Sequence, residues 1–435
     1  MQPISIELPH RDFSAIKKAG LALCAVGFLF MIMALMEVSR SNPVLFFMLS
    51  AGSMVTGALV FILPQLKESP AGIKHNRLFF LSATSRGFWG WAAAVFFTGF
   101  YVILYWFPQY LENLIRTTDW LSWIMRGKPA DQWFLYGFYY TLAVVVMGIR
   151  MIVKNRHNRY QIIRTCSVMF FQLGFAFLIP GLLQLFNQPE FYFTYFWPLK
   201  YSYLFPNDIQ WLMSQPGGLG VFMIYWGAMM SFVATPALTY FFGKRWYCSW
   251  VCGCGGLAET LGDPYRHLSD KSLWSWKIER YLIYSVLVFV VMTTLLLWIN
   301  SATQGAMFGT WSQNFSSVYG FYIGALFSGV IGVGFYPLMG SRVWCRFGCP
   351  MAAILGLLQK YWSRFRITTN GGQCISCGNC STYCEMGIDV RAYAMKGQNI
   401  IRASCVGCGI CSAVCPRGVL NLENGPMEGR YNLGR

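Results

Sequence analysis

The sequence predicts an α-helical polytopic membrane protein with about eight transmembrane helices, followed by a small C-terminal α+β domain. Three observations lead to this fold class. The chain has 435 residues, of which 55% are hydrophobic and only 12% are charged, and this composition excludes an ordinary soluble domain. Long apolar stretches recur along most of the chain. The cysteines, in contrast, concentrate in a less apolar C-terminal segment.

Eight apolar stretches are long enough, at about 20 residues, to cross a bilayer core of about 30 Å. They are residues 20–38, 44–64, 87–107, 134–153, 165–186, 218–242, 281–299 and 319–339. The first stretch is long, and no small-residue cleavage site follows it, so we expect no cleavable signal peptide.

The distribution of basic residues predicts the orientation of these spans. If the N-terminus is cytoplasmic, the inner segments hold 17 Lys and Arg residues and the outer loops hold 5. This asymmetry follows the positive-inside rule and places both termini in the cytoplasm of a bacterial inner membrane. Orientation and attraction to anionic membrane lipid also explain the net charge of +17, so we expect no nucleic-acid partner.

Two matched cysteine runs close the chain, and each reads C-x2-C-x2-C-x3-C. This repeated spacing is the ligand pattern of a bacterial-type ferredoxin with two 4Fe-4S clusters, in which the fourth cysteine of each run serves the other cluster. Pro416 follows the second run, whereas Glu385 follows the first. We therefore assign one cluster to Cys374, Cys377, Cys380 and Cys415, and the other to Cys405, Cys408, Cys411 and Cys384.

Structural zinc is the main alternative for these eight cysteines. Zinc needs only two pairs of cysteines, so a third and a fourth cysteine in each run would have no role. Disulfides are not expected on the reducing side of the membrane. A segment as short as 367–435 builds little hydrophobic core, and we expect it to fold only with its clusters bound.

A second cysteine system precedes the runs. The motif R-x2-C-x3-C occurs twice, each time after an apolar stretch, and it contains Cys248 and Cys252 in the first copy and Cys345 and Cys349 in the second. Cysteines at i and i+4 of a helix share one face. Each pair is therefore expected to present two thiolates in one direction, and two neighbouring pairs would supply four soft ligands.

Three interpretations of these four cysteines compete. They bind a third iron–sulfur cluster or a metal ion. They form redox-active dithiols whose pKa values are lowered by Arg245, Arg342 and Arg346. Or they pack as small buried residues. The duplication argues against packing alone, and we favour the metal or cluster site, where Cys254 could replace a ligand.

The twelve cysteines and the preceding spans resemble the NapH/NosR type of membrane polyferredoxin over residues 218–422. Such proteins accompany periplasmic nitrate and nitrous-oxide reductases, and they are similar to membrane iron–sulfur proteins that assist oxidase assembly. The resemblance implies quinol-linked electron transfer in support of a partner enzyme, with a quinone as a candidate further cofactor. Gly253 departs from the family pattern, which has proline after the second cysteine of the motif.

We therefore expect three regions. Residues 1–217 form a membrane region of about five spans, 218–366 a membrane domain with the duplicated motifs, and 367–435 the double-cluster ferredoxin domain. The expected function is to relay single electrons between the quinone pool of a respiratory chain and a redox partner protein or membrane complex. The chain would be an electron-transfer subunit of an oxidoreductase and not a stand-alone catalyst. The alternative is a factor that reduces a metal or maintains thiols during assembly of a respiratory metalloenzyme.

Two other segments could contribute. The loop 187–217 is rich in aromatic residues, which is typical of a membrane-interface belt and also compatible with a quinone pocket or a partner surface. Glu259, Asp263 and His267 follow the first motif and are candidates for proton transfer to a quinone.

Overall fold

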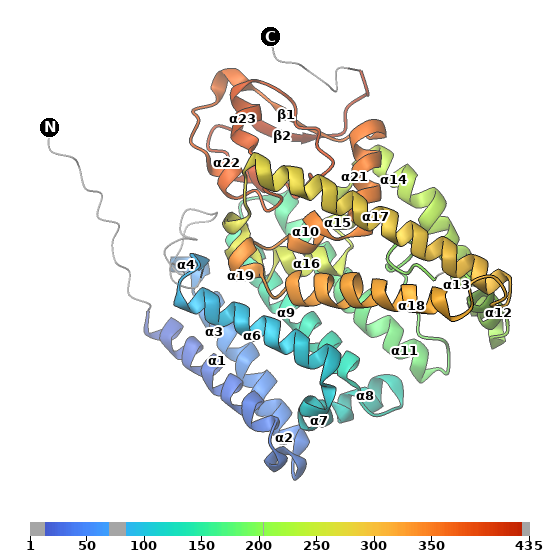
Figure 1. Cartoon of the computed structure of the whole chain (residues 1–435). Coiled ribbons are helices and arrows are strands. Elements are labelled where there is room, and N and C mark those ends of the chain that lie inside the picture. Colours follow the sequence, from blue (N-terminus) through green and yellow to red (C-terminus); the bar gives the residue numbers. More distant parts are fainter. Residues whose placement is uncertain (1–13, 69–83, 203, 429–435) are drawn as a thin grey trace.

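The computed structural model describes residues 14–68, 84–202 and 204–428 (Figure 1). Within these residues, eight helical segments are long and apolar enough to cross a membrane, which confirms the predicted multi-pass fold. Four of them are single α-helices, namely α1 (Ala15–Ala34), α6 (Phe88–Trp106), α9 (Gln132–Lys154) and α17 (Leu273–Ala302). The other four are longer segments that contain the named α-helices: Pro43–Lys67 contains α2 (Pro43–Phe47) and α3 (Ser53–Ile62), and Arg159–Leu185 contains α10 (Arg159–Phe170) and α11 (Ile179–Leu185). Leu219–Phe242 contains α13 (Leu219–Ala228) and α14 (Thr235–Phe242), and Gly309–Ile331 contains α18 (Gly309–Tyr319).

Shorter helices connect the spans. They are α4 (Gln65–Glu68), α7 (Glu112–Arg116), α8 (Asp119–Arg126), α12 (Pro206–Met213), α15 (Arg245–Cys248), α16 (Gly253–Glu259), α19 (Tyr336–Met339), α20 (Val343–Phe347) and α21 (Pro350–Trp362). The two copies of the cysteine motif lie in this connecting structure, at α15–α16 and at α20–α21.

Four spans differ from their predicted bounds by four residues or more. The first was expected at 20–38 and covers Ala15–Ala34, and the fifth was expected at 165–186 and covers Arg159–Leu185. The other two differ more. α17 begins eight residues before 281, because its first turns carry Lys277 and Arg280 and so lack the apolar signal of a span. The last span was expected at 319–339 but covers Gly309–Ile331. Its chain turns at Gly332, and a separate short helix, α19, follows. The polar residues of α18 hid the true start of this span from a hydropathy reading.

The first two spans pack through glycines. A Cβ atom on Gly20 would lie 2.8 Å from the carbonyl oxygen of Gly57, and one on Gly57 would lie 2.7 Å from the backbone nitrogen of Cys24. Small residues allow transmembrane helices to approach this closely. Cys24 belongs to the same contact, where its Sγ lies 3.6 Å from the carbonyl oxygen of Met54.

The C-terminal segment forms the predicted small α+β domain. Strands β1 (Arg366–Thr369) and β2 (Leu420–Glu423) pair in antiparallel fashion, with Arg366 opposite Glu423 and Thr369 opposite Leu420. Three short helices lie between the strands, α22 (Asn379–Thr382), α23 (Val390–Met395) and α24 (Ile410–Ala413). The strands therefore bring the two ends of the cysteine-rich segment together (Figure 1).

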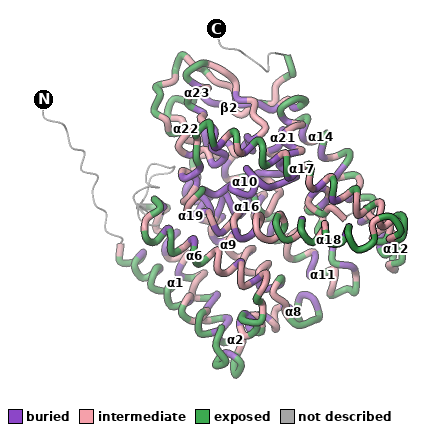
Figure 2. Tube along the Cα trace, viewed as in Figure 1, coloured by how far each residue is buried: buried purple, intermediate pink, exposed green. Residues whose placement is uncertain are grey.

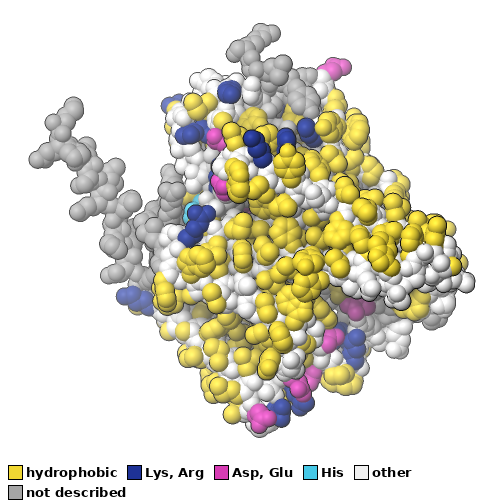
Figure 3. Space-filling model, in the orientation of Figure 1, with side chains coloured by type: hydrophobic (Ala, Val, Ile, Leu, Met, Phe, Trp, Pro, Cys, Tyr) yellow, Lys and Arg dark blue, Asp and Glu magenta, His cyan; other side chains and the backbone are white. Residues whose placement is uncertain are grey.

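The largest core cluster is shared between this domain and the membrane region. It contains Tyr247 and Trp344 from the motif helices, and Ile367, Ile388 and Val406 from the C-terminal domain. Figure 2 shows buried residues gathered around α10 and α16, below the C-terminal domain, whereas α1 is largely exposed. Figure 3 shows hydrophobic side chains over the middle of the visible face and charged ones mainly toward its two ends, as expected for a surface in contact with lipid.

The aromatic loop after α11 folds back into the protein. Phe196 is only 1% exposed and its ring centroid lies 5.6 Å from that of Tyr247. The Tyr247 hydroxyl also donates to the carbonyl oxygen of Thr194 at 2.6 Å. Irregular backbone at membrane depth is tolerated where it is buried in protein. The expected interface belt therefore describes only the exposed part of this loop, such as Tyr192 and Tyr195, because the rest packs against the first cysteine motif.

Candidate metal centres

The structure brings the eight C-terminal cysteines together in two groups of four, and each group lines its own cavity. Each cavity has a volume of about 20 Å³. We call them the distal and the proximal cavity. The distal cavity is lined by Cys374, Cys377, Cys380 and Cys415, and the proximal cavity by Cys384, Cys405, Cys408 and Cys411. Each cavity thus combines three cysteines of one run with the fourth cysteine of the other.

The two runs adopt the same local conformation. Gly378 and Gly409 have left-handed backbone angles, with φ of 79° and 73°, and each precedes the short helix that carries the third cysteine of its run. Glycine adopts such angles without steric penalty. This turn places Cys380 and Cys411 beside the loops that hold the first two cysteines of their runs.

The arrangement fits a four-iron cluster better than single zinc ions. A tetrahedral zinc site with Zn–S bonds of 2.3 Å holds its sulfur atoms about 3.8 Å apart. Zinc does not require the fourth cysteine of each run to serve the other run, whereas the lining of both cavities shows this exchange. A 4Fe-4S cluster binds each thiolate to a different iron atom, so its ligands surround a larger space.

The proximal cavity is held against the membrane region through its loop backbone. Four consecutive carbonyl oxygens of this loop accept hydrogen bonds from side chains of the membrane region. The bonds run from Gln359 Nε2 to Cys405 at 2.8 Å, Ser249 Oγ to Val406 at 2.8 Å, the Tyr160 hydroxyl to Gly407 at 2.9 Å, and Gln161 Nε2 to Cys408 at 2.8 Å. The distal cavity faces outward instead, since Cys377 is exposed and Ile375 is 54% exposed.

The duplicated motifs do not place their cysteines on one helical face, so that prediction is wrong. Cys248 ends α15, and Cys252 precedes α16 with an extended backbone (φ −67°, ψ 126°). Cys345 lies in α20, and Cys349 precedes α21 in a similar conformation (φ −84°, ψ 116°). In the second copy the following residue is Pro350, which disfavours a helical residue before it. Each pair therefore spans the break between two short helices.

The break has the same hydrogen bonding in both copies. The backbone nitrogen of Cys252 donates to the carbonyl oxygen of Tyr247 at 2.8 Å, and that of Cys349 donates to Trp344 at 3.0 Å, five residues back in each case. Cys248, Cys345 and Cys349 are at most 6% exposed, and Cys252 packs against the same core cluster. The structure thus brings the four motif cysteines into one buried group, with Cys254 solvent-accessible beside it.

Burial is the main influence on the pKa values of three of these four thiols. It raises the pKa of Cys248 to about 12 and raises the pKa of Cys345 and Cys349 as well. Cys252 is different, because a hydrogen bond from Cys254 helps to lower its pKa to about 7. Three of the four thiols are therefore poor nucleophiles unless a metal displaces their protons.

The expected effect of the neighbouring arginines is found only at Arg342. Its Nη1 atom donates to Cys345 Sγ at 3.6 Å and to the carbonyl oxygen of Cys248 at 3.1 Å, and its charge lowers the pKa of Cys345 against the larger effect of burial. Arg346 pairs with Glu279 at 2.7 Å. Arg245 instead stacks over the ring of Phe365, with its guanidinium carbon 4.9 Å from the ring centroid.

A buried network of ion pairs surrounds this site, and sequence patterns did not predict it. It contains three carboxylates and five cations, all at most 8% exposed. The pairs are Asp263 with Arg150, Lys154 and Arg266, Glu259 with Arg164 and Arg342, and Glu385 with Arg266 and Arg342. The sequence drew attention to Glu385, which stands where the second run has proline, and to Glu259 and Asp263 after the first motif, but it did not indicate that these carboxylates form ion pairs.

This network changes the interpretation of the candidate proton carriers. Burial raises the pKa of Glu385, but Arg266 and Arg342 outweigh it and hold this pKa below its usual range. The same holds for Asp263, where Lys154 and Arg150 outweigh burial. Glu259 and Asp263 therefore serve as structural counter-ions, and His267 is half-buried in the same segment. The cations exceed the carboxylates by two, which favours anionic thiolates at the neighbouring motif cysteines.

Comparison with known families and proteins agrees with this arrangement. A family model described as a 4Fe-4S binding domain matches residues 225–272 and 322–370, and one described as a 4Fe-4S dicluster domain matches residues 366–416. Each segment of the first match contains one C-x3-C motif, and the second match contains both C-terminal runs. No solved structure matches the chain.

Three curated proteins are similar to part of the chain. They are YccM of Escherichia coli, a protein provisionally named for electron transport (27% identity over 178 residues, 38% of this chain and 48% of YccM), the methylamine utilization ferredoxin-type protein MauN of Methylobacillus flagellatus (27% over 165 residues, 36% and 54%), and the ferredoxin-type protein NapH of Escherichia coli (27% over 168 residues, 37% and 55%). The matched region spans about half the length of each relative. The chain is therefore a distant homologue of the NapH, MauN and YccM group of ferredoxin-type membrane proteins with 4Fe-4S binding domains.

Proposed function

We propose that this protein transfers single electrons between a membrane-bound redox couple and a partner protein, using 4Fe-4S clusters bound by its cysteines. The observation that carries the proposal is the exchange of the fourth cysteines. Cys415 lines the cavity of the first run and Cys384 lines the cavity of the second, as the ligand pattern of two-cluster ferredoxins requires. A 4Fe-4S cluster supplies one-electron redox chemistry when bound in such a cavity.

The two cavities would have different roles. Hydrogen bonds from Gln359, Ser249, Tyr160 and Gln161 fix the proximal loop to the membrane region, so the proximal cysteines would exchange electrons with the membrane side. The exposed Cys377 lies on the distal side. The distal cysteines would therefore exchange electrons with the partner, either a soluble redox protein or a subunit of a membrane complex.

We assign a third centre to Cys248, Cys252, Cys345 and Cys349. Three features support this assignment: the burial of these cysteines in one group, the two excess positive charges in the neighbouring ion-pair network, and the match of both motif segments to a 4Fe-4S binding domain. A third centre beside the membrane spans would accept electrons from the quinol pool and pass them to the proximal cysteines. The excess of basic residues supports a bacterial inner membrane with these centres on the cytoplasmic side.

The alternative function, maintenance of thiols or metal reduction during assembly of another enzyme, is favoured by one observation. Cys252 has a pKa of about 7 and Cys254 is a neighbouring thiol, so this pair could exchange disulfides at neutral pH. The two functions differ in the iron content that they require at the motif cysteines.

The test is the iron and acid-labile sulfide content per chain, together with EPR spectra of the reduced protein. We expect about twelve irons in the wild type and about eight in a Cys248→Ser/Cys345→Ser variant, at four irons per cluster. The matched control is Cys166→Ser, because Cys166 is an exposed thiol outside both groups and should leave the iron content unchanged. About eight irons in all three proteins would remove the third centre and favour the thiol function, whereas zinc in place of iron would contradict the electron-transfer proposal itself.

A further inference from the structure

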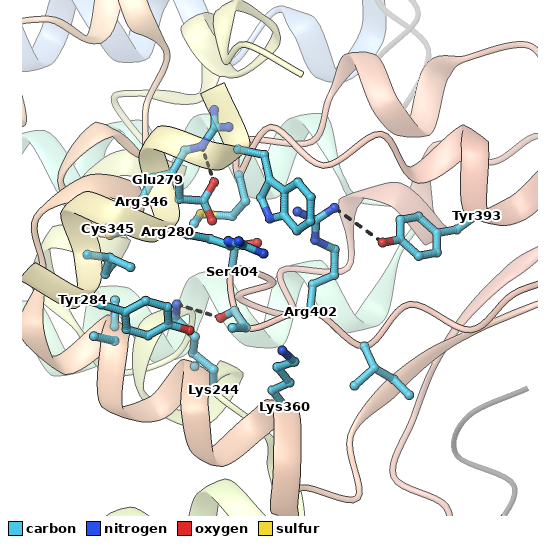
Figure 4. Close-up of a pocket in the computed structure, with 18 residues that line it drawn as sticks. Lys244, Glu279, Arg280, Tyr284, Cys345, Arg346, Lys360, Tyr393, Arg402 and Ser404 are labelled. Atoms are coloured by element: carbon cyan, nitrogen blue, oxygen red, sulfur yellow. Dashed lines mark hydrogen bonds and ion pairs between the residues drawn. The ribbon is translucent and has the colours of Figure 1, made fainter. Parts of the chain in front are cut away.

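A cavity of about 170 Å³ lies where the C-terminal domain meets the spans (Figure 4). Its walls come from the first turns of α17, from α21, and from residues 401–404 before the second cysteine run. The lining residues of α17 recur at helical spacing, from Trp276 to Tyr284, and therefore occupy one face of the helix. Cys345 of the second motif also lines the cavity.

The lining carries an excess of positive charge. Five cations and one carboxylate face the cavity, and they are Lys244, Arg280, Arg346, Lys360, Arg402 and Glu279. Glu279 is paired with Arg346 at 2.7 Å. In the described part of the chain, no carboxylate oxygen lies within 4.0 Å of a side-chain nitrogen of Lys244, Arg280 or Arg402. The cavity therefore has a strongly positive potential.

Several of these cations are held in place by the protein. The guanidinium carbons of Arg402 and Arg280 lie 4.5 and 4.9 Å from the ring centroid of Trp276. Arg402 also donates to the Tyr393 hydroxyl at 3.4 Å. Lys244 is 1% exposed and uses one of its hydrogens on the carbonyl oxygen of Ala403, at 3.2 Å. Figure 4 shows Lys360 extending from α21 toward Arg402 of the opposite loop.

Exposed aromatic side chains indicate the level of the cavity relative to the membrane. Trp274 and Tyr281 on α17 are 72% and 74% exposed, and Tyr361 and Trp362 at the end of α21 are 54% and 61% exposed. Tyrosine and tryptophan concentrate where the bilayer meets water. The cavity therefore lies at the level of the lipid headgroups, on the side of the membrane that carries the C-terminal domain.

We propose that this cavity binds the phosphate group of an anionic phospholipid. Basic pockets between transmembrane helices recognise such headgroups, and guanidinium groups match the oxygen atoms of a phosphate. Because the walls come from both the spans and residues 401–404, the bound headgroup fastens the C-terminal domain to the membrane region beside Cys345. If the cations of the cavity served only to compensate the negative charge of the motif thiolates, the protein would show no preference for a particular lipid.

Lipid binding to the purified, delipidated holoprotein tests this site. Phosphatidylglycerol, phosphatidylcholine and inorganic phosphate are titrated separately, and the melting temperature and native mass spectra are recorded. We expect phosphatidylglycerol to stabilise the wild type and to bind at least tenfold more tightly than phosphatidylcholine. The Arg280→Gln/Arg402→Gln variant should lose this preference while retaining its iron. Its matched control is Lys277→Gln, since Lys277 is an exposed cation on the same helix that does not line the cavity.

Equal binding of the two lipids by the wild type, or an unchanged preference in the double variant, would overturn the proposal. Stabilisation by inorganic phosphate to the same extent as by phosphatidylglycerol would assign the cavity to a soluble phosphate compound and overturn the lipid assignment. If the double variant does not accumulate, the single Arg280→Gln change at an exposed side chain still tests the site, because it should weaken phosphatidylglycerol binding severalfold.

Discussion

Glu385 and Arg342 form an ion pair at the centre of the buried network, with Arg342 Nε 3.1 Å from Glu385 Oε1 and both side chains fully buried. Glu385 directly follows the proximal cysteine Cys384, and Arg342 also donates to Cys345 of the motif group. One ion pair therefore joins the C-terminal domain to the third proposed centre. The cysteines beside the two paired residues, Cys384 and Cys345, are both proposed ligands.

Replacement of Glu385 by glutamine should loosen the C-terminal domain. The change leaves Arg266 and Arg342 without this counter-ion, and breaking a buried pair costs about 3–5 kcal/mol. Denaturant titration of the holoprotein should show a loss of this size. The matched control is Glu423→Gln in the same domain, whose carboxylate is 47% exposed in its pair with Arg366 and should contribute less than about 1 kcal/mol. Equal effects of the two changes would contradict the central role of Glu385.

The Asp263→Asn variant should be destabilised by a similar amount, about 3–5 kcal/mol, because Lys154, Arg150 and Arg266 lose their shared carboxylate. Asp263 has a folded-state pKa below its usual value of about 3.9. Its contribution is thus complete above that value and declines as the pH falls toward the lower folded pKa. The difference in stability between variant and wild type should therefore stay constant from about pH 6.5 to about pH 5. A difference that disappears near pH 6 would indicate that Asp263 is protonated there.

The two glycines of the cysteine runs should respond differently to substitution by alanine. Both have positive φ values, and alanine should cost about 1 kcal/mol at each from the backbone alone. A Cβ atom on Gly378 has no heavy atom closer than 3.9 Å, whereas one on Gly409 would lie 2.8 Å from Tyr160 Cε1. Overpacking adds about 1–3 kcal/mol, so Gly409→Ala should melt at a lower temperature than Gly378→Ala. The reverse order would mean that the proximal loop is not fastened to α10.

Removal of iron should unfold the C-terminal domain and leave the spans intact. In the described residues, this domain contains two four-residue strands, three α-helices of at most six residues and one 3-10 helix of three residues. Without the clusters, the free thiols supply none of the iron–sulfur bonds that would hold these short elements together. Trypsin should then cut rapidly near Arg391 and Lys396 in iron-free protein and slowly in holoprotein. As a control, the helical circular dichroism signal, which comes mainly from the spans, should be the same in iron-free protein and holoprotein. A protease-resistant C-terminal domain in iron-free protein would contradict this expectation.

Much of the architecture follows from local sequence patterns. Eight apolar stretches of sufficient length produced eight span-length helices, because a chain in lipid must satisfy its backbone hydrogen bonds within each helix. The largest errors in the span bounds arose at Gly309–Ile331 and at the start of α17, where polar residues interrupt the apolar signal. The conformation around the motif cysteines was also missed, since the helix break between Cys345 and Cys349 depends on Pro350 and on a turn that the spacing alone does not reveal.

The sequence by itself determined the membrane class, the span number and the grouping of the eight C-terminal cysteines, because each depends on composition or on short, regular spacing. Only the tertiary structure decided which carboxylate forms an ion pair with which cation. Glu259, Asp263 and Glu385 are separated by up to 126 residues from one another and pair with cations from four parts of the chain, so no local pattern relates them. Because these charged side chains are buried, each must be paired. The tertiary structure also decided that the proximal cysteines lie against the membrane region and that the distal ones face outward.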